Sequence, residues 1–113
     1  MADPDCLFCK IVAGDVPSTE VYADAHTYAF ADLNPQAPTH VLLVPRQHFS
    51  NIGELGRDEA AAAGYLAGLS GLVERLGLDQ YRTVFNTGAE VGQSVFHVHG
   101  HVLAGRPMGW PPG

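Results

Sequence analysis

The stretch Ser-Val-Phe-His-Val-His-Gly-His-Val-Leu, residues 94–103, decides the fold, because histidine alternates in it with apolar or small residues. A period of two is that of a β-strand, whose successive side chains point to opposite faces. We therefore predict a strand over 95–103 that carries His97, His99 and His101 on one face. Small and aliphatic residues occupy the other face.

Three imidazoles on one strand face need an explanation. A polar, solvated face is the ordinary interpretation, but the aliphatic opposite face and the preference of exposed strands for Thr, Lys or Glu oppose it. Each ring brings a hydrogen-bond donor and an acceptor, which an apolar core cannot satisfy. Two explanations remain: the imidazoles bind a metal ion, or they take part in a reaction that uses the ordinary imidazole pKa of about 6.5. Side chains two positions apart on a strand diverge, so at most two of the three histidines can bind one metal ion. At least one neutral imidazole is then free, and it can attack phosphorus as a nucleophile.

The loop before the histidines offers a candidate anion site. Gly92, Gln93 and Ser94 bring backbone N–H groups and a hydroxyl to the start of the strand. Consecutive N–H groups of this kind can cradle an anion. The alternative is an ordinary glycine turn, but the position beside three histidines favours the anion cradle.

The rest of the chain predicts short strands and two helices. Glycine and proline separate the apolar runs, and Asp5 and Gly77 stand where a helix N-cap and a helix stop are expected. The expected helices span 6–13 and 58–76, and the expected strands span 19–23, 26–31, 40–44, 81–85 and 95–103. This order indicates a single α+β domain over 1–113, with a five-stranded antiparallel sheet, one long helix and one short helix. Residues 105–113 form a tail.

Two faces of the long helix are distinguishable. Apolar side chains at helical spacing form a predicted core stripe: Leu66, Leu69, Val73 and Leu76. Glycines form a second face: Gly64, Gly68 and Gly71. Each interior glycine costs about 1 kcal/mol relative to alanine. Either these glycines have no role, or another backbone approaches them closely, from the sheet or from a second subunit.

Composition excludes several classes of partner. Twelve acidic residues face six basic ones, which are scattered singly, so the net charge is −6. The chain therefore lacks the basic footprint of a protein that binds nucleic acid or a membrane surface. It has no apolar run of the ~20 residues that a membrane span needs. The acidic start and the two cysteines favour a cytoplasmic protein without a disulfide framework.

The histidine stretch resembles the His-x-His-x-His pattern of the histidine triad (HIT) family, and its flanks resemble the Hint branch. The flanking similarities are Phe8-x-Lys10-Ile11, the segment 32–40 (Asp-Leu-Asn-Pro-Gln-Ala-Pro-Thr-His), Gly92-Gln93-Ser94 and the ending 105–113. The resemblance implies an α+β homodimer whose two sheets join into a larger one. It also implies binding of purine nucleotides of the AMP or GMP type and hydrolysis of phosphoramidate or acyl-phosphate links at the α-phosphorus.

The resemblance assigns roles by position. His99 is implied as the nucleophile, Asp32 as the partner of the ribose hydroxyls, and Leu33 as a packing residue at the nucleoside. Ser94 falls where a hydroxyl meets the leaving group, and His40 where a further histidine lines the pocket. The positions implied to contact phosphate are Asn86, Gly92, Gln93, Ser94, His99 and His101. Gly100 departs from the pattern, which has a bulky apolar residue there, so the packing behind the strand is expected to differ.

Cys6 and Cys9 form a CxxC pair, which alone also occurs in redox motifs and by chance. A thioredoxin-like context is absent. A structural zinc needs two further ligands, and His48 and His97 would supply them. Zinc-bearing members of the HIT superfamily use this arrangement. The alternative is two buried free thiols. No cofactor is expected to take part in the chemistry itself.

Three interpretations of function remain open at this point. The first is a nucleoside phosphoramidase. The second is a dinucleoside polyphosphate hydrolase or nucleotidyl transferase of a related branch, and the third is a nucleotide-binding scaffold with incidental activity. Trp110, flanked by prolines, has no evident place in its own core, which favours a homodimer whose tail reaches the partner's site. A frayed chain end is the competing interpretation.

Overall fold

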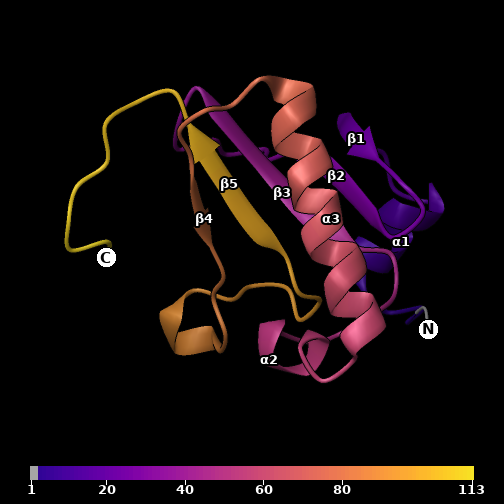
Figure 1. Ribbon diagram of the computed structural model, residues 1–113. Coiled ribbons are helices and arrows are strands. Elements are labelled where there is room, and N and C mark those ends of the chain that lie inside the picture. Colours follow the sequence, from indigo (N-terminus) through magenta and orange to yellow (C-terminus); the bar gives the residue numbers. More distant parts are fainter. Residues whose placement is uncertain (1–2) are drawn as a thin grey trace.

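A five-stranded antiparallel sheet in the order β1-β2-β3-β5-β4 forms the centre of the computed structural model, which describes residues 3–113. Helix α3 covers one face of the sheet, and the short helix α1 lies against the other (Figure 1). The predicted α+β class, the five strands and the two main helices are confirmed. Met1 and Ala2, with which the predicted domain begins, lie outside the described residues.

Most element boundaries fall within two residues of the predicted ones. The strands are β1 (Glu20–Ala23), β2 (Thr27–Ala31), β3 (Thr39–Pro45), β4 (Arg82–Val84) and β5 (Gly100–Ala104). The helices are α1 (Leu7–Ala13), α2 (Ile52–Leu55), α3 (Glu59–Leu76) and a 3-10 turn over Ala89–Val91. Helix α2 was not predicted, because its four residues show no apolar period. Asn51 is its N-cap, and the Asn51 side chain accepts the Glu54 N–H at 3.0 Å.

The predicted strand over 95–103 is wrong in its first half, since regular pairing begins only at Gly100. Gly100 pairs with Leu43, and the partner strand ends two residues later at Pro45, which has no N–H to donate. The Val98 N–H instead donates to the Phe49 carbonyl at 2.7 Å. Two of the three histidines therefore lie in a segment that runs ahead of β5.

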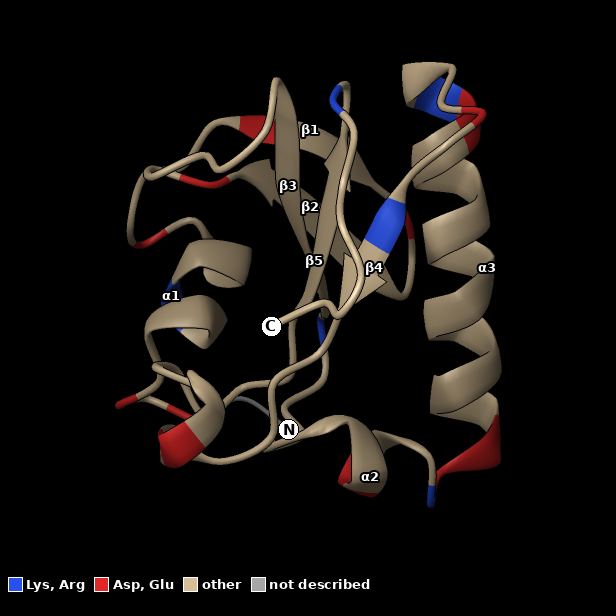
Figure 2. Cartoon of the chain, turned by 90° about the vertical axis from the view of Figure 1, so that its left-hand side faces the viewer, with Lys and Arg blue, Asp and Glu red and all other residues tan. Residues whose placement is uncertain are grey.

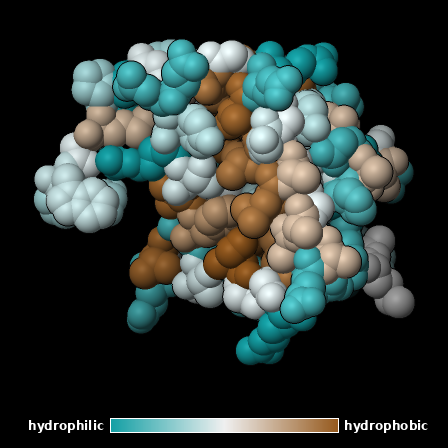
Figure 3. Space-filling model, in the orientation of Figure 1, coloured by the Kyte–Doolittle hydropathy of each residue, from teal (hydrophilic) through white to brown (hydrophobic). Residues whose placement is uncertain are grey.

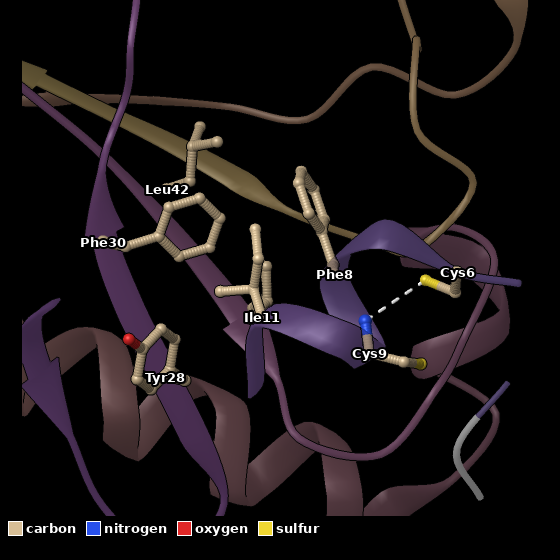
Figure 4. Packing of buried hydrophobic residues seen from close by; sticks show 8 residues of the cluster. Cys6, Phe8, Cys9, Ile11, Tyr28, Phe30 and Leu42 are labelled. Atoms are coloured by element: carbon tan, nitrogen blue, oxygen red, sulfur yellow. Dashed lines mark hydrogen bonds between the residues drawn. The ribbon is translucent and has the colours of Figure 1, made fainter. Parts of the chain in front are cut away.

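Helix α1 packs its inner face on the sheet. Phe8 and Ile11 from α1 meet Phe30 and Leu42 from β2 and β3 in a buried cluster (Figure 4). The helix begins one residue later than predicted, because Cys6 and not Asp5 is the N-cap. Its Sγ accepts the Cys9 N–H at 3.4 Å.

The core face of α3 differs from the predicted stripe. The buried residues of the helix are Tyr65, Gly68 and Leu72, whereas Leu66 is 64% exposed. The remaining stripe residues, Leu69, Val73 and Leu76, are partly buried at the edge of the core. Alanine and glycine make much of the helix circumference weakly apolar, so the sequence pattern could not place the core face to within one residue.

The glycine face of α3 lies against its own sheet. A Cβ at Gly64 would stand 2.8 Å from the His26 ring, and Cβ atoms at Gly68 and Gly71 would collide with Thr27 and Tyr22. Of the two alternatives, a close approach to the glycines is therefore observed, but it is made by side chains and not by the expected backbone. These glycines are consequently not available to a second subunit. None of the helices formed by residues 3–113 combines the length and the apolar character that a membrane span needs.

Candidate active site

His99 is buried, and its imidazole is fixed in one tautomer. Its Nδ1 lies 2.9 Å from the backbone oxygen of His97. Because a carbonyl only accepts, Nδ1 carries the proton and donates it, which leaves the lone pair on Nε2. The edge of the ring of Phe8 meets the His99 imidazole at 90°, with 5.0 Å between the centroids. The ring is thus held with a free, unprotonated Nε2, as a nucleophile toward an electrophilic centre requires.

Two groups of ligand-type side chains occur among the described residues: Cys6, Cys9, His48 and His97; and Asp32, His40 and His101. In the first group the Nδ1 of His97 lies 3.4 Å from Cys6 Sγ, 3.5 Å from Cys9 Sγ and 3.2 Å from His48 Nδ1. Tetrahedral zinc with ordinary Zn–S and Zn–N bonds separates such atoms by about 3.3–3.6 Å. The four residues therefore fit a structural zinc ion.

The protonation of His97 also suits a metal ligand. Its Nε2–H donates to the Pro45 carbonyl at 2.9 Å, so Nδ1 faces the cysteines without a proton. His97 is 0% exposed, and burial lowers its pKa to about 4, which keeps the ring neutral. Burial raises the pKa of the Cys6 thiol, and a bound divalent cation would reverse that effect by favouring the thiolate.

The second group has the opposite hydrogen-bond pattern. The Gln36 N–H donates to His40 Nδ1 at 3.0 Å, which places the proton of a neutral His40 on Nε2. That Nε2–H points at His101 Nδ1, 2.9 Å away, so the remaining proton of His101 lies on Nε2. Asp32 Oδ2 stands 3.4 Å from His40 Nε2. The proton on His40 Nε2 lies between His40 and His101, so these side chains form a hydrogen-bonded relay. The group therefore does not offer three free lone pairs to a metal ion.

His101 can donate a hydrogen bond as a neutral ring. Burial is the main cause that lowers its pKa, with the neighbouring His99 and His40 acting in the same direction and Asp32 opposing them. The His99 and His101 ring centroids are 5.1 Å apart. The structure thus places the His99 ring, whose Nε2 is unprotonated, next to the His101 ring, which carries its proton on Nε2. A ring that can attack and a ring that can donate a hydrogen bond to a developing negative charge are therefore neighbours.

The loop between β4 and the histidines is braced by Gln93. Its buried side chain accepts the Gly88 N–H at 2.9 Å and donates to the Ser50 carbonyl at 2.7 Å. The backbone N–H groups of Gly92 and Gln93 donate within the loop, to Ala89 and Gly88. Contrary to the predicted cradle, these two N–H groups are thus already bonded. The exposed Ser94 is the polar member of the predicted cradle that faces outward.

Three other predicted residues are less enclosed. Asn86 is half-buried, and its amide lies beside Gly92, at 3.6 Å from where a Cβ of Gly92 would stand. Gly92 has a φ of 102°, a conformation that favours glycine. Leu33 is 100% exposed, next to Asp32. It packs against none of residues 3–113, so a role at the nucleoside would require contact with the ligand itself.

A hollow of about 340 Å³ opens beside the zinc-type cluster and Ser94. Asp3 and Asp5 line it together with the exposed ring of Phe96. In Figure 2, the ribbon is red, marking acidic residues, at several places near this end of the molecule, whereas the blue stretches that mark Lys and Arg stand apart from one another. The mouth of the site on the Ser94 side is therefore anionic and partly apolar.

Comparison with known proteins agrees with this arrangement. The family model described as HIT domain matches residues 13–108. The chain belongs to the HIT domain family. Among curated relatives, it is 45% identical over 111 residues to an uncharacterised HIT-like protein of Synechocystis, covering 96% of this chain and 97% of that protein. A 14 kDa zinc-binding protein of Zea mays is 42% identical over 115 residues, covering 98% and 90%.

Solved structures of HIT proteins share the fold. A HIT family hydrolase from Legionella pneumophila superimposes with a TM-score of 0.88 at 44% identity, covering 96% of this chain and 100% of that one. A histidine triad protein from Clostridium difficile has a TM-score of 0.88 at 37% identity, covering 96% and 97%. The HIT-like fold and the family stated from the resemblance are confirmed, and the family relationship supports assignment to the hydrolases.

Sequence reasoning missed two features of the HIT site. The ring of Phe8 supports His99, and the Gln36 N–H sets the tautomer of His40. Phe8 could have been found as an inward-facing apolar residue three positions before Ile11 on the short helix. The Gln36 contact is made by a backbone group in a proline-bounded loop, for which the sequence carries no signal.

Proposed function

We propose that this HIT protein is a nucleoside phosphoramidase that cleaves nucleoside 5′-phosphoramidates at the α-phosphorus through a covalent nucleotidyl-histidine. Acyl-nucleotides are a second electrophile of the same kind. The observation that carries the proposal is the free Nε2 of His99, which the Nδ1–H···O bond to His97 leaves unprotonated beside His101. An unprotonated imidazole with a neighbouring donor suits attack on a phosphoryl centre.

The reaction has two displacements. His99 Nε2 forms a bond to the α-phosphorus while the bond from phosphorus to the leaving nitrogen breaks, and the amine departs with a proton taken from solvent. Water then attacks the same phosphorus and releases a proton to solvent, the His99–phosphorus bond breaks, and a nucleoside monophosphate and neutral His99 remain. His101 and the exposed Ser94 are proposed to donate hydrogen bonds to the phosphoryl oxygens and the leaving group, and His40 keeps His101 in the required tautomer.

The nucleoside end of a purine substrate of the AMP or GMP type is assigned to Asp32. One carboxylate oxygen of Asp32 accepts the Asn34 N–H at 2.8 Å, and the other faces the His40–His101 pair, so the side chain is held in place. A fixed carboxylate suits the two vicinal hydroxyls of ribose as donors. Leu33, Asn86, Gly92 and Gln93 are proposed to complete the nucleotide site, the last two by shaping the loop rather than through their N–H groups.

The anionic mouth favours an amine leaving group. Asp3 and Asp5 line the hollow at Ser94, and the chain carries a net charge of −6. A protonated amine with an apolar stem is attracted to such a surface, whereas a leaving nucleoside polyphosphate is repelled. This charge pattern supports the phosphoramidase over the dinucleoside polyphosphate hydrolase.

Intact-protein mass spectrometry tests the proposal directly. After rapid mixing with adenosine phosphoramidate, the protein should gain the mass of one AMP moiety and then lose it as AMP accumulates. The same protein should turn over diadenosine polyphosphate far more slowly. Failure of any phosphoramidate to give an adduct or AMP would refute the proposed activity and leave the scaffold interpretation.

Replacing Ser94 by alanine should lower turnover less than loss of the nucleophile does. The hydroxyl is one donor among several, and one donor at a developing charge is worth about 10²–10³ in rate at most. Steady-state kinetics on adenosine phosphoramidate measure the effect, with Ser50→Ala as a control because its backbone, not its hydroxyl, bonds Gln93. A loss of 10⁴-fold or more would show that Ser94 has a larger role.

We propose in addition that Cys6, Cys9, His48 and His97 hold a structural zinc ion. The fit of the four ligand atoms supports this, and so does the zinc-binding relative from Zea mays. When bound, zinc supplies a cross-link between the start of α1 and the segment that carries His99. Two cysteines that bind zinc as thiolates, and are not joined in a disulfide, suit a reducing compartment, in agreement with the proposed cytoplasmic location.

A homodimer is proposed on the exposed features of one side of the molecule. Figure 3 shows hydrophobic side chains gathered in a band along α3 and the sheet beside it. On α3, Leu66 is 64% exposed. Strand β4 is an edge of only three residues, and a hollow of about 680 Å³ lies between it and the root of the tail. An exposed apolar band and an unpaired edge suit a second copy of the chain.

The tail is proposed to reach the partner's site. Trp110 is 82% exposed, and the tail stands away from the body in Figure 1, tied by the Arg82 guanidinium donating to the Gly109 carbonyl at 3.1 Å. A truncation after Met108 should therefore change turnover or substrate preference while each subunit stays folded. Trp110→Ala, which keeps the tail length, should act in the same direction. A monomer by light scattering at micromolar concentration, or unchanged kinetics on several substrates, would contradict this prediction.

A further inference from the structure

Tyr65 links α3 to the two central strands at the point where their pairing ends. Its hydroxyl donates to the Leu43 carbonyl at 2.8 Å and accepts the Gly100 N–H at 3.1 Å. Leu43 and Gly100 are the last paired residues of β3 and β5 on the side of the histidines. The tyrosine is 2% exposed, and burial raises the pKa of its phenol, so the hydroxyl keeps its proton.

Gly100 makes this contact sterically feasible. A Cβ there would lie 2.7 Å from the Tyr65 hydroxyl oxygen and 3.0 Å from the Phe85 ring. The glycine is therefore matched to the tyrosine, because the Tyr65 hydroxyl, which comes from α3, occupies the space that a side chain at position 100 would need. Since Gly100 does not have a positive φ, the reason for glycine at this position is space rather than backbone conformation.

The contact controls the backbone around His99. The Gly100 N–H belongs to the peptide unit that follows His99, while the unit before His99 is not paired with β3. On the other side, the Val98 N–H is held by the Phe49 carbonyl. The position of the His99 Cα thus depends on two anchors outside the regular sheet, and the Tyr65 hydroxyl is one of them.

We infer that Tyr65 is a positioning residue for His99 and His101, acting through the Gly100 backbone. It touches neither substrate nor reacting atoms, and its catalytic consequence rests on the proposed function. Removing the hydroxyl leaves the Gly100 N–H and the Leu43 carbonyl buried without this partner, so the segment between the two histidines relaxes. A displacement of about 1 Å at a reacting group can cost about 10²-fold in rate.

The Tyr65→Phe variant tests the inference, because it keeps the ring and removes only the hydroxyl. Single-turnover formation of the AMP adduct should slow by about tenfold to a hundredfold. The dissociation constant for AMP should change by less than about threefold, since the Asp32 carboxylate, which is proposed to hold the nucleoside, is fixed by the Asn34 N–H and lies outside the segment that relaxes. A rate within twofold of wild type would overturn the inference.

Tyr22→Phe is the matched control. Tyr22 also faces α3, at Gly71, and its hydroxyl is also hydrogen-bonded, donating to Asp24 at 3.0 Å. It lies on β1, at the far edge of the sheet. This variant should leave the adduct rate unchanged, and an equal loss in both variants would show a general stability effect and overturn the positioning role.

A double-mutant comparison tests the match between Tyr65 and Gly100. Gly100→Ala should lower the adduct rate more in the wild type than in Tyr65→Phe, where the colliding oxygen is gone. Equal costs in both backgrounds would contradict the match.

NMR supplies a readout that does not depend on turnover, so failure of the proposed activity remains distinguishable from failure of this inference. In Tyr65→Phe, the Gly100 amide should lose protection from hydrogen exchange, and the His99 and His101 ring signals should shift. Tyr22→Phe should leave these signals in place. Unchanged His99 ring signals in Tyr65→Phe would overturn the inference even if the protein hydrolysed no phosphoramidate.

Discussion

His99→Ala should lower turnover of adenosine phosphoramidate by about 10⁴-fold or more, because removing a covalent nucleophile abolishes the pathway through which both displacements run. The Nδ1–H bond to the His97 carbonyl leaves His99 Nε2 as the free lone pair of the ring. No adduct should appear by intact-protein mass spectrometry. Binding of AMP should largely persist, since His40 is hydrogen-bonded to His101 and contacts Asp32, and these contacts do not involve the His99 side chain.

Two comparisons make this prediction specific. His26→Ala removes an exposed imidazole that faces α3 at Gly64, on the opposite side of the sheet from α1, and should leave turnover unchanged. His101→Ala removes a donor and not the attacking atom, so it should slow the reaction while still giving a detectable adduct. If His99→Ala hydrolysed the substrate near the wild-type rate, the assignment of the nucleophile would be wrong.

The alternation of histidine with apolar residues was sufficient to predict which side chains would gather, although it misjudged the strand. His99 and His101 are adjacent rings, and the Phe8 ring contacts both His97 and His99. An extended segment keeps its period of two whether or not a neighbour pairs with it. The loss of pairing before Gly100 depends on Pro45 and on the Phe49 carbonyl, which lie about fifty residues away in sequence.

The chemical state of each histidine could not be predicted from the sequence. Identical imidazoles are suited to different proposed roles, as a nucleophile, a metal ligand and a relay, because different backbone groups bond one nitrogen of each ring. Those groups are the His97 carbonyl, the Pro45 carbonyl and the Gln36 N–H. Such contacts depend on tertiary structure rather than on residue type. The same holds for Tyr65, which the helical period did not identify because alanine and glycine surround it.

Removing zinc should lower the thermal stability of the protein by a large amount without removing a catalytic group. The proposed ligands join the start of α1 to the segment before β5 and to the loop after β3, so metal bound to the folded state stabilises all three together. At a free zinc concentration 1,000 times the dissociation constant, the stabilisation is about 4 kcal/mol. For a domain of this size that corresponds to about 15 °C in the unfolding midpoint.

Cys9→Ser provides the matched variant for that measurement. It removes one thiolate from the metal set, so it should show the lower midpoint from the start and should not respond to a chelator. The wild type should lose its higher midpoint on chelation and regain it when zinc is returned. Because His97 positions His99 through its backbone carbonyl, the zinc-free protein should still form the AMP adduct, more slowly than the loaded protein but far faster than His99→Ala. Elemental analysis should find one zinc per chain, and metal-free purified protein with an unchanged midpoint would mean that the two cysteines are buried free thiols.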